Sequence, residues 1–228
     1  MRSGAVSRRP CWVKRRRATV RALLMAEKNS IHFIYYFASS CDGFIADASG
    51  GVEWLNAFHG GVDYGANDLF KSFDGAVMGR KTYEQALTLG KWGFSAKMPC
   101  VVLSKTRTSG PHVDFWQQPV EGVRECFLKK GAKNVWLVGG GAAASSFLSA
   151  GLLTDIRQAV MPVVLGSGIP AYGALEKHMR LKLAESKEFS NGVVALRYTP
   201  VKHGKVTRLS EVMCGGNKGS KRADHGLN

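Results

Sequence analysis

The chain has 228 residues, of which 45% are hydrophobic, and this size suits one globular domain with short appendages. Its net charge of +15 is unevenly distributed, because residues 1–28 contribute +8, residues 200–228 contribute +4, and the long middle segment contributes only +3. A nucleic-acid-binding domain would carry its positive charge on the folded part, so this distribution argues against a nucleic-acid partner.

The N-terminal 28 residues are rich in arginine and contain no acid before Glu27. Their longest apolar run, residues 22–26, is too short for the core of a signal peptide or for a membrane helix. Three interpretations stay open: translation that starts at Met25, an organellar transit peptide, or an arm that binds nucleic acid. We expect disordered basic ends at residues 1–28 and 201–228, around one domain at residues 29–200.

Hydrophobic patterning predicts strands and helices that alternate along most of the chain. The predicted strands cover residues 31–38, 75–78, 99–104, 113–116, 134–138, 155–165, 181–189 and 193–199. The predicted helices cover residues 63–73, 80–89, 120–130 and 142–150, and residues 39–57 are predicted to be a loop. Repeated β-α units of this kind predict an α/β fold with a mainly parallel sheet and helices on both faces.

Glycine and proline set several of the expected boundaries. Gly90, Gly131 and Gly151 are expected to follow the ends of three helices. Pro162 should bend or break the long strand in which it lies. Asn191-Gly192 predicts a tight turn between the last two strands, which would then form an antiparallel hairpin at the sheet edge.

Two glycine-marked turns follow predicted strands and open into predicted helices. The first is Gly79, followed by Arg80, Lys81 and Thr82, and the second is the triplet at residues 139–141. Free N–H groups and the positive dipole at a helix start suit a phosphate, and paired cations there also favour an anion. Such glycines are also common in ordinary turns, but two such sites together suggest a dinucleotide.

The triplet followed by alanines matches a Rossmann-like glycine pattern, but two features argue against a Rossmann NAD site. It comes late in the chain, and no acid ends the next strand to hold a ribose hydroxyl, because Asp155 precedes that strand. Three successive glycines also lose much backbone entropy on folding, and this cost favours the interpretation that they serve to bind a ligand. The cations that follow the first glycine turn, Arg80 and Lys81, favour NADPH over NADH as that ligand.

Five motifs occur in a characteristic order. They are Ser-x-Asp-Gly-x-Ile-Ala at 40–46, Met-Gly-Arg-Lys-Thr-Tyr-Glu at 78–84, Val-Val-Leu-Ser at 101–104, Val-Gly-Gly-Gly at 138–141 and Pro-Val-Val-Leu-Gly-Ser-Gly at 162–168. Over about residues 31–199 the chain resembles the dihydrofolate-reductase-like superfamily. Within it, the chain is most similar to the reductase (C-terminal) domain of the riboflavin-pathway deaminase-reductase and its stand-alone bacterial relatives.

The resemblance implies a three-layer fold with a sheet of about eight strands and NADPH bound across the carboxyl ends of the central strands. It also implies a homodimer. The residues it assigns to the cofactor are Ala38 and Ile45 at the nicotinamide, Gly79 and Thr82 at the pyrophosphate, Arg80, Lys81, Ser104 and Lys105 at the 2′-phosphate, and Gly139, Gly140, Gly141 and Ala142 along the pyrophosphate and nicotinamide ribose.

The implied reaction is hydride transfer from NADPH to a small heterocycle, as in 5-amino-6-(5-phosphoribosylamino)uracil reductase. Asp42 and Asp63 are the candidate catalytic carboxylates, although Asp42 also fits a turn and Asp63 fits a helix N-cap. A dihydrofolate or pterin reductase and a non-catalytic NADP-binding protein are the alternatives. Cys41 stands where the riboflavin reductases more often carry leucine, and no phosphate clamp is evident in the substrate loop.

The five cysteines fit no zinc or redox motif, and no zinc-deaminase signature occurs. We therefore expect no metal site. A scattered, odd number of cysteines without a secretion signal favours a cytoplasmic protein.

Overall fold

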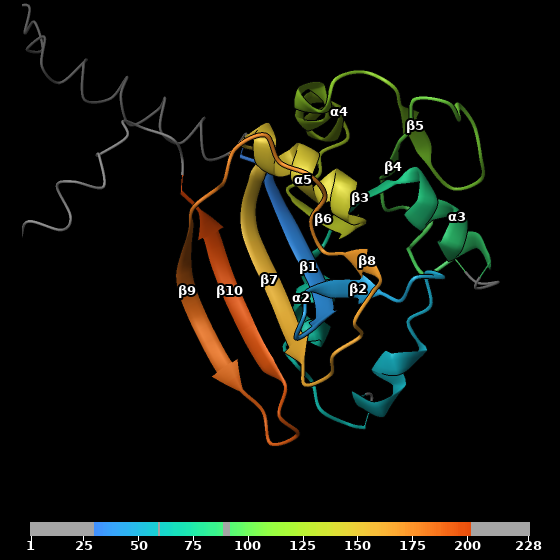
Figure 1. Ribbon diagram of the computed structural model, residues 1–228. Coiled ribbons are helices and arrows are strands. Elements are labelled where there is room, and N and C mark those ends of the chain that lie inside the picture. The colour runs from blue at the N-terminus through green and yellow to red at the C-terminus, as the bar shows by residue number, and fades with distance from the viewer. Residues whose placement is uncertain (1–29, 59, 89–91, 202–228) are drawn as a thin grey trace, which may run out of the picture.

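The computed structural model describes residues 30–58, 60–88 and 92–201. They form one eight-stranded sheet with the order β5-β4-β3-β6-β1-β7-β10-β9 (Figure 1). The strands are β1 (His32–Ser40), β3 (Gly75–Gly79), β4 (Cys100–Leu103), β5 (Asp114–Trp116), β6 (Asn134–Gly139), β7 (Leu153–Met161), β9 (Leu181–Glu188) and β10 (Val194–Pro200).

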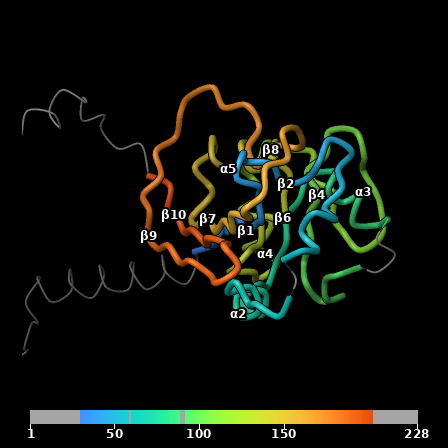
Figure 2. Tube along the Cα trace, turned by 60° about the horizontal axis from the view of Figure 1, so that its bottom comes forward, coloured from blue at the N-terminus to red at the C-terminus, as the bar shows by residue number. Residues whose placement is uncertain are grey.

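The first six strands in that order pair in parallel, whereas β10 pairs antiparallel with both β7 and β9. This arrangement confirms the predicted α/β fold with an antiparallel C-terminal hairpin. The hairpin and α3 lie at opposite ends of the sheet (Figure 2). None of the helices in the described ranges is long and apolar enough to cross a membrane.

Helices cover both faces of the sheet. They are α2 (Ala66–Ser72), α3 (Arg80–Thr88), α4 (Val123–Lys129) and α5 (Gly141–Ser149), with short 3-10 helices η1 (Glu53–Phe58) and η2 (Val120–Gly122). On one face, α4 and α5 bury the alternate β1 residues Phe33, Tyr35 and Phe37 in the main core. On the other face, Phe70 of α2 packs its ring against Tyr36 and Trp136. The alternation of side chains along β1 therefore builds two separate apolar layers.

Three expectations about local structure are wrong or incomplete. The predicted loop at 39–57 contains η1 and the short strand β2 (Phe44–Ala46), which pairs with β8 (Ile169–Pro170). These strands are too short to show a hydrophobic period. The predicted helix at 120–130 begins as η2, and β7 begins at Leu153, so that Asp155 lies inside the strand.

Glycine and proline follow the ends of strands and helices as predicted. β7 ends at Met161, before Pro162, while Gly131 and Gly151 follow α4 and α5 with positive φ angles of 76° and 64°. Gly192 turns the hairpin with φ of 82°. The predicted helix stop at Gly90, the predicted N-terminal extension at 1–28 and all but the first residue of the predicted tail at 201–228 lie outside the described residues.

A buried carboxylate joins β7 to β10. The Asp155 side chain is only 8% exposed and accepts hydrogen bonds from Arg157 Nε at 3.0 Å and from Arg197 Nε at 3.0 Å. Arg157 and Arg197 are themselves register partners on the two strands. One carboxylate therefore ties together two cations at the point where the parallel sheet meets the antiparallel hairpin.

We expect Asp155→Asn to lower the free energy of unfolding by about 1–3 kcal/mol, because a neutral amide leaves two guanidinium groups without their counter-ion. Urea denaturation would measure this change. Asp68→Asn is the matched control, since Asp68 is 98% exposed and only 3.9 Å from Lys71 Nζ in a surface ion pair. Equal losses in the two variants would contradict the role of Asp155.

Candidate functional site

The site lies where three neighbouring parallel strands end. β4, β3 and β6 are adjacent, with Gly79 opposite Leu103 and Met78 opposite Gly139. Ser104, Arg80 and Gly140 therefore follow strands that end at the same edge of the sheet, which is where open α/β sheets bind ligands. The fold brings the two glycine turns together as the sequence predicted.

The two glycine turns are in near contact. A Cβ on Gly79 would lie 3.8 Å from the Gly139 carbonyl oxygen, and one on Gly140 would lie 3.7 Å from Thr82 Oγ1. Gly139 adopts a φ of 143°, which residues with side chains rarely adopt. Larger residues at these positions would fill the space between the two turns.

Gly141 has a different reason to be glycine. Its carbonyl oxygen accepts a hydrogen bond from Gly173 N at 2.9 Å, and a Cβ on Gly141 would collide with the Pro170 carbonyl oxygen. Its lack of a side chain therefore lets residues 170–173 pack against the start of α5. Ala142 follows as an exposed residue in the first turn.

The helix starts are electrostatically suited to phosphate. α5 begins without a side-chain hydrogen bond to cap it, so the N–H groups of its first turn keep their capacity to donate. α3 has no acid in its first turn and begins with two cations, Arg80 and Lys81. Cations oppose the helix dipole there, so an anion bound beside them would relieve an unfavourable arrangement.

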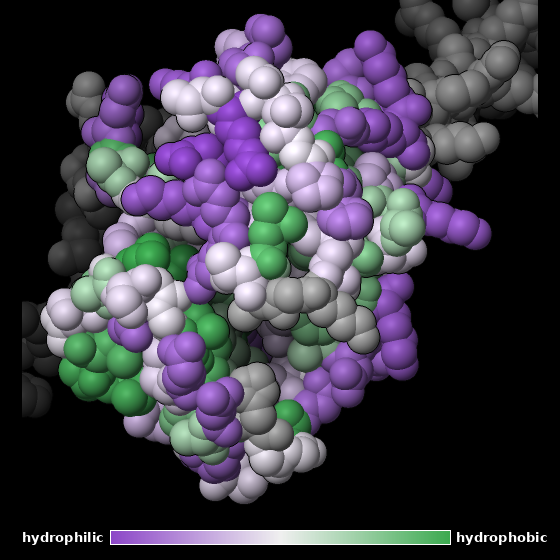
Figure 3. All heavy atoms as spheres, turned by 90° about the vertical axis from the view of Figure 1, so that its right-hand side faces the viewer, coloured by the Kyte–Doolittle hydropathy of each residue, from purple (hydrophilic) through white to green (hydrophobic). Residues whose placement is uncertain are grey.

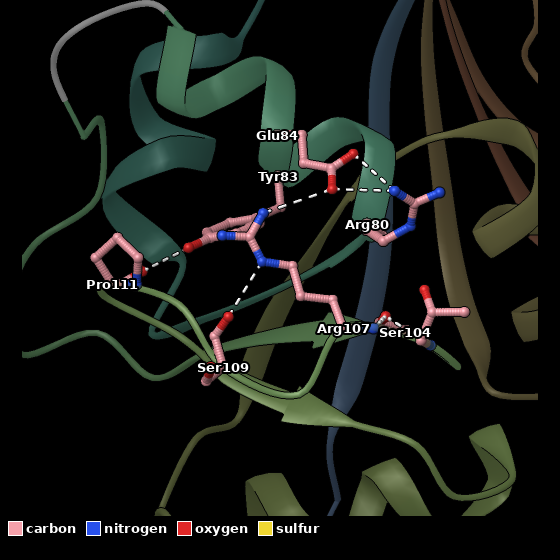
Figure 4. A network of polar contacts seen from close by, with 8 residues as sticks. Arg80, Tyr83, Glu84, Ser104, Arg107, Ser109 and Pro111 are labelled. Carbon is pink, nitrogen blue, oxygen red and sulfur yellow. Dashed lines mark hydrogen bonds and ion pairs between the residues drawn. The ribbon is translucent and has the colours of Figure 1, made fainter.

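Arg80 belongs to a charged cluster that includes a residue the sequence analysis did not single out. Arg80 Nη1 lies 3.0 Å from both carboxylate oxygens of Glu84, and Arg107 Nη1 lies 3.5 Å from Glu84 Oε1 (Figure 4). The Arg107 guanidinium stacks over the Tyr83 ring at 5.0 Å and donates from Nε to the Ser109 carbonyl. Two arginines therefore share one carboxylate beside the first turn.

Ser104 shapes the loop that carries Arg107. Its buried hydroxyl oxygen accepts hydrogen bonds from Arg107 N at 2.8 Å and Thr106 N at 3.3 Å. Lys105, which follows Ser104, and Lys81, which follows Arg80, are both exposed. The surface on the α3 side of the molecule is hydrophilic over most of its upper half, whereas apolar side chains gather at its lower left (Figure 3).

A hollow of about 560 Å³ opens on the α2 face of the sheet. Ala38, Phe58, Asp63, Trp136 and Met161 are among the residues that line it. Ala38, predicted at the nicotinamide, and Asp63, predicted to be catalytic, thus line the same hollow. Ile45, the other predicted nicotinamide residue, packs against the main core from β2.

The two predicted catalytic carboxylates both bind backbone N–H groups. Asp42 accepts from Gly166 N at 2.7 Å and Leu165 N at 3.2 Å, and Asp63 accepts from Ala66 N at 2.7 Å and Asn67 N at 3.2 Å. The Ser40 hydroxyl and these N–H groups hold the pKa of Asp42 below its usual value. The N–H groups of Asn67 and Ala66 likewise lower the pKa of Asp63. Both carboxylates are therefore ionised at neutral pH, and their catalytic roles remain predictions.

These pKa shifts predict an acid-dependent part of the stability. Each carboxylate has a folded-state pKa below its ordinary 3.8, so the stability it adds is present above that value and is lost as the pH falls through the folded-state pKa. We expect the double variant Asp42→Asn/Asp63→Asn to lose less stability than the unsubstituted protein between about pH 5 and about pH 2. Urea titrations across this range would measure it, and identical pH profiles would contradict it.

Sequence reasoning missed two parts of this site. Arg107 was not assigned to the cofactor, although it follows Ser104 by three residues, and its Nη1 lies 3.5 Å from Glu84 Oε1 in α3. The apolar wall from Leu55, Phe58 and Tyr64 was also missed, because it comes partly from η1 inside the predicted loop. Trp54 of η1 packs against the small cluster of Ala159, Met161 and Val193.

Comparison with known proteins agrees with this architecture. YwjB of Bacillus subtilis (strain 168), an uncharacterised protein, is 30% identical over 162 residues, which cover 70% of this chain and 93% of YwjB. The structure is similar to a putative riboflavin biosynthesis protein from Shewanella sp. PV-4, with a TM-score of 0.68 and 28% identity over 75% of this chain and 100% of that one.

The same fold occurs in dihydrofolate reductase from Enterococcus faecalis, which was solved in complex with NADP(H). That enzyme has a TM-score of 0.55 and 12% identity over 76% of this chain and 97% of its own. The model of the RibD C-terminal domain matches residues 32–195, which contain both glycine turns, the arginine cluster and the hollow. The chain therefore belongs to the RibD C-terminal domain family of reductases and has the dihydrofolate-reductase-like fold.

Proposed function

We propose that this protein is an NADPH-dependent reductase that transfers a hydride to a small heterocyclic substrate. The observation that carries the proposal is the cluster of Arg80 and Arg107 around Glu84 beside the paired glycine turns. Two cations held by a single carboxylate retain a positive charge that can bind a further anion. The adenosine 2′-phosphate, which NADPH has and NADH lacks, would supply that anion.

The residues at the sheet edge fit the rest of the cofactor. Gly79, Gly139 and Gly140 let the backbone approach a pyrophosphate, with Thr82 as a hydroxyl donor between the two turns. Ser104 would hold the Arg107 loop in place, while Lys81 and Lys105 would add positive charge around the 2′-phosphate. NADPH, when bound, supplies the hydride, and the protein supplies binding and orientation.

The hollow beside Ala38 is proposed as the substrate site. Its aromatic residues, Tyr36, Phe58 and Trp136, suit a flat ring, and Asp63 and Asn67 add polar groups to the lining. Asp63 is held ionised by α2, so it would orient a ring N–H as an acceptor and would not deliver a stored proton. Among substrates, 5-amino-6-(5-phosphoribosylamino)uracil is favoured by the family, and a dihydropterin is the second candidate.

Steady-state oxidation of NADPH tests this function. The full chain would be assayed with the phosphoribosylaminouracil and with dihydrofolate, each against a control without substrate. Turnover that depends on substrate and prefers NADPH to NADH is the expected result. Binding of NADPH without turnover of either substrate would instead favour a non-catalytic NADP-binding protein.

We also propose that the protein forms a homodimer and is located in the cytoplasm. The edge strand β9 exposes all its residues, including Leu183 at 50%, which suits pairing with a second copy. Cys41, Cys100 and Cys126 are unpaired, as in proteins of a reducing compartment, and burial raises the pKa of Cys100 to about 11. Sedimentation at several protein concentrations would test the dimer.

A further inference from the structure

A second, smaller hollow lies on the same face of the sheet as the proposed substrate site. It has a volume of about 180 Å³ and is enclosed by the start of α2, β7 and the C-terminal hairpin. Tyr36 and Tyr64 line both hollows, so the two share a wall. Tyr64 is held there by its hydroxyl, which donates to the Phe58 carbonyl oxygen at 2.8 Å, and by edge-to-face packing on Phe189 at 5.0 Å.

The smaller hollow contains two arginines in a fixed arrangement. Arg157 and Arg197 both bind the buried carboxylate of Asp155 through their Nε atoms at 3.0 Å. Within the described residues, neither arginine donates a hydrogen bond from its terminal Nη atoms to a protein acceptor. Their side chains are 33% and 43% exposed, so these terminal nitrogens can reach a ligand in the hollow. Asp155 therefore acts as a positioning residue for two guanidinium groups.

The charges in this hollow leave a positive excess. Besides the two arginines, Lys187 lines it, with its ammonium 4.9 Å from the centre of the Phe189 ring. Two carboxylates oppose these three cations: Asp155 beneath the arginines and Glu185, the register partner of Arg197 on β9. One positive charge remains uncompensated, and planar guanidinium groups bind the paired oxygens of an oxyanion in a bidentate manner.

We propose that Arg157 and Arg197 form an anion subsite for an acidic group of the substrate, a phosphate ester or a carboxylate. The inference rests on the proposed function, because the ring of that substrate would occupy the larger hollow and its acidic tail would pass Tyr36 and Tyr64. A bidentate oxyanion there would satisfy the Nη donors that the protein leaves free. This subsite lies on the hairpin side of the substrate hollow and is separate from the cofactor cations Arg80 and Arg107.

Binding of small anions tests the subsite independently of catalysis. Inorganic phosphate and acetate would be titrated separately into the full chain, and the Nε–H signals of its arginines would be followed by NMR. We expect saturable shifts of the Arg157 and Arg197 signals with at least one anion. Phosphate alone would indicate a phosphate ester, and acetate alone a carboxylate. Shifts confined to Arg80 and Arg107 would report the cofactor site and would overturn the proposal.

Substitutions then test which groups bind. Arg157→Lys and Arg197→Lys keep the charge and a donor for Asp155 but remove the planar fork, and each should weaken anion binding about tenfold, the value of one good charged hydrogen bond. Lys182→Ala on the same hairpin is the control, because Lys182 does not line the hollow, and it should leave the affinity unchanged. Equal anion affinity in all three variants would overturn the subsite.

A kinetic comparison separates this proposal from the proposed function. With the phosphoribosylaminouracil and its dephosphorylated form, Arg157→Lys should raise KM only for the phosphorylated substrate if the tail is a phosphate ester. If Arg157→Lys changes the KM for both substrates by the same factor, the phosphate assignment is overturned. Absence of turnover in the unsubstituted protein would refute the reductase function, while the anion titration would still decide whether the subsite exists.

Discussion

Replacing Arg80 by alanine should raise the dissociation constant for NADPH by about 10- to 100-fold, the value of one or two charge-assisted hydrogen bonds. The affinity for NADH should change by less than about twofold, because NADH has no 2′-phosphate for Arg80 to bind. Arg80 is 41% exposed and its ion pair with Glu84 spans one helical turn, so its removal should cost the fold little. Calorimetric titration of each cofactor would measure both affinities.

Arg180→Ala is the matched control for this experiment. It removes the same side chain from an exposed position outside the proposed cofactor site, so NADPH affinity should not change. Arg107→Ala should resemble Arg80→Ala, because both guanidinium groups approach Glu84. Equal losses of NADPH and NADH affinity in Arg80→Ala would show that Arg80 does not bind the 2′-phosphate. An unchanged NADPH affinity would remove it from the site altogether.

The second large effect is expected at Gly141. A methyl group there would collide with the Pro170 carbonyl oxygen and would crowd Gly173 N at 3.1 Å, both of them backbone atoms that cannot rotate away. We expect Gly141→Ala to lower the free energy of unfolding by about 2–3 kcal/mol, as overpacked sites do. The better helix propensity of alanine, up to about 1 kcal/mol, would offset only part of this loss.

Gly93→Ala provides the comparison for the second experiment. A Cβ on Gly93 would meet no heavy atom within 4 Å, and the same substitution there should change stability by less than about 0.5 kcal/mol. Chemical denaturation of the two variants would separate a steric effect at Gly141 from a general effect of glycine replacement. A stable Gly141→Ala protein would mean that residues 170–173 can shift away from α5.

The sequence predicted the parts of the site that local patterns encode. Gly79 and the 139–141 triplet each follow a buried apolar strand, and because the carboxyl ends of parallel strands share one edge of a sheet, their proximity could be expected. The role of Arg80 could be predicted because two adjacent cations at the start of a helix oppose the helix dipole. Gly141 was assigned to the cofactor on the same pattern, yet its packing against Pro170 supplies a sufficient structural reason.

The amino-acid sequence by itself determined the order of the longer strands and helices, the parallel sheet, the hairpin and the position of the glycine turns, because these depend on the period of side chains and on backbone freedom at single residues. Only the tertiary structure decided that Arg107 joins Arg80 on Glu84, that η1 lines the substrate hollow, and that Asp155 holds Arg157 and Arg197 together. Those contacts join residues from separate elements, and their partners are set by strand register and layer packing, which no local pattern encodes.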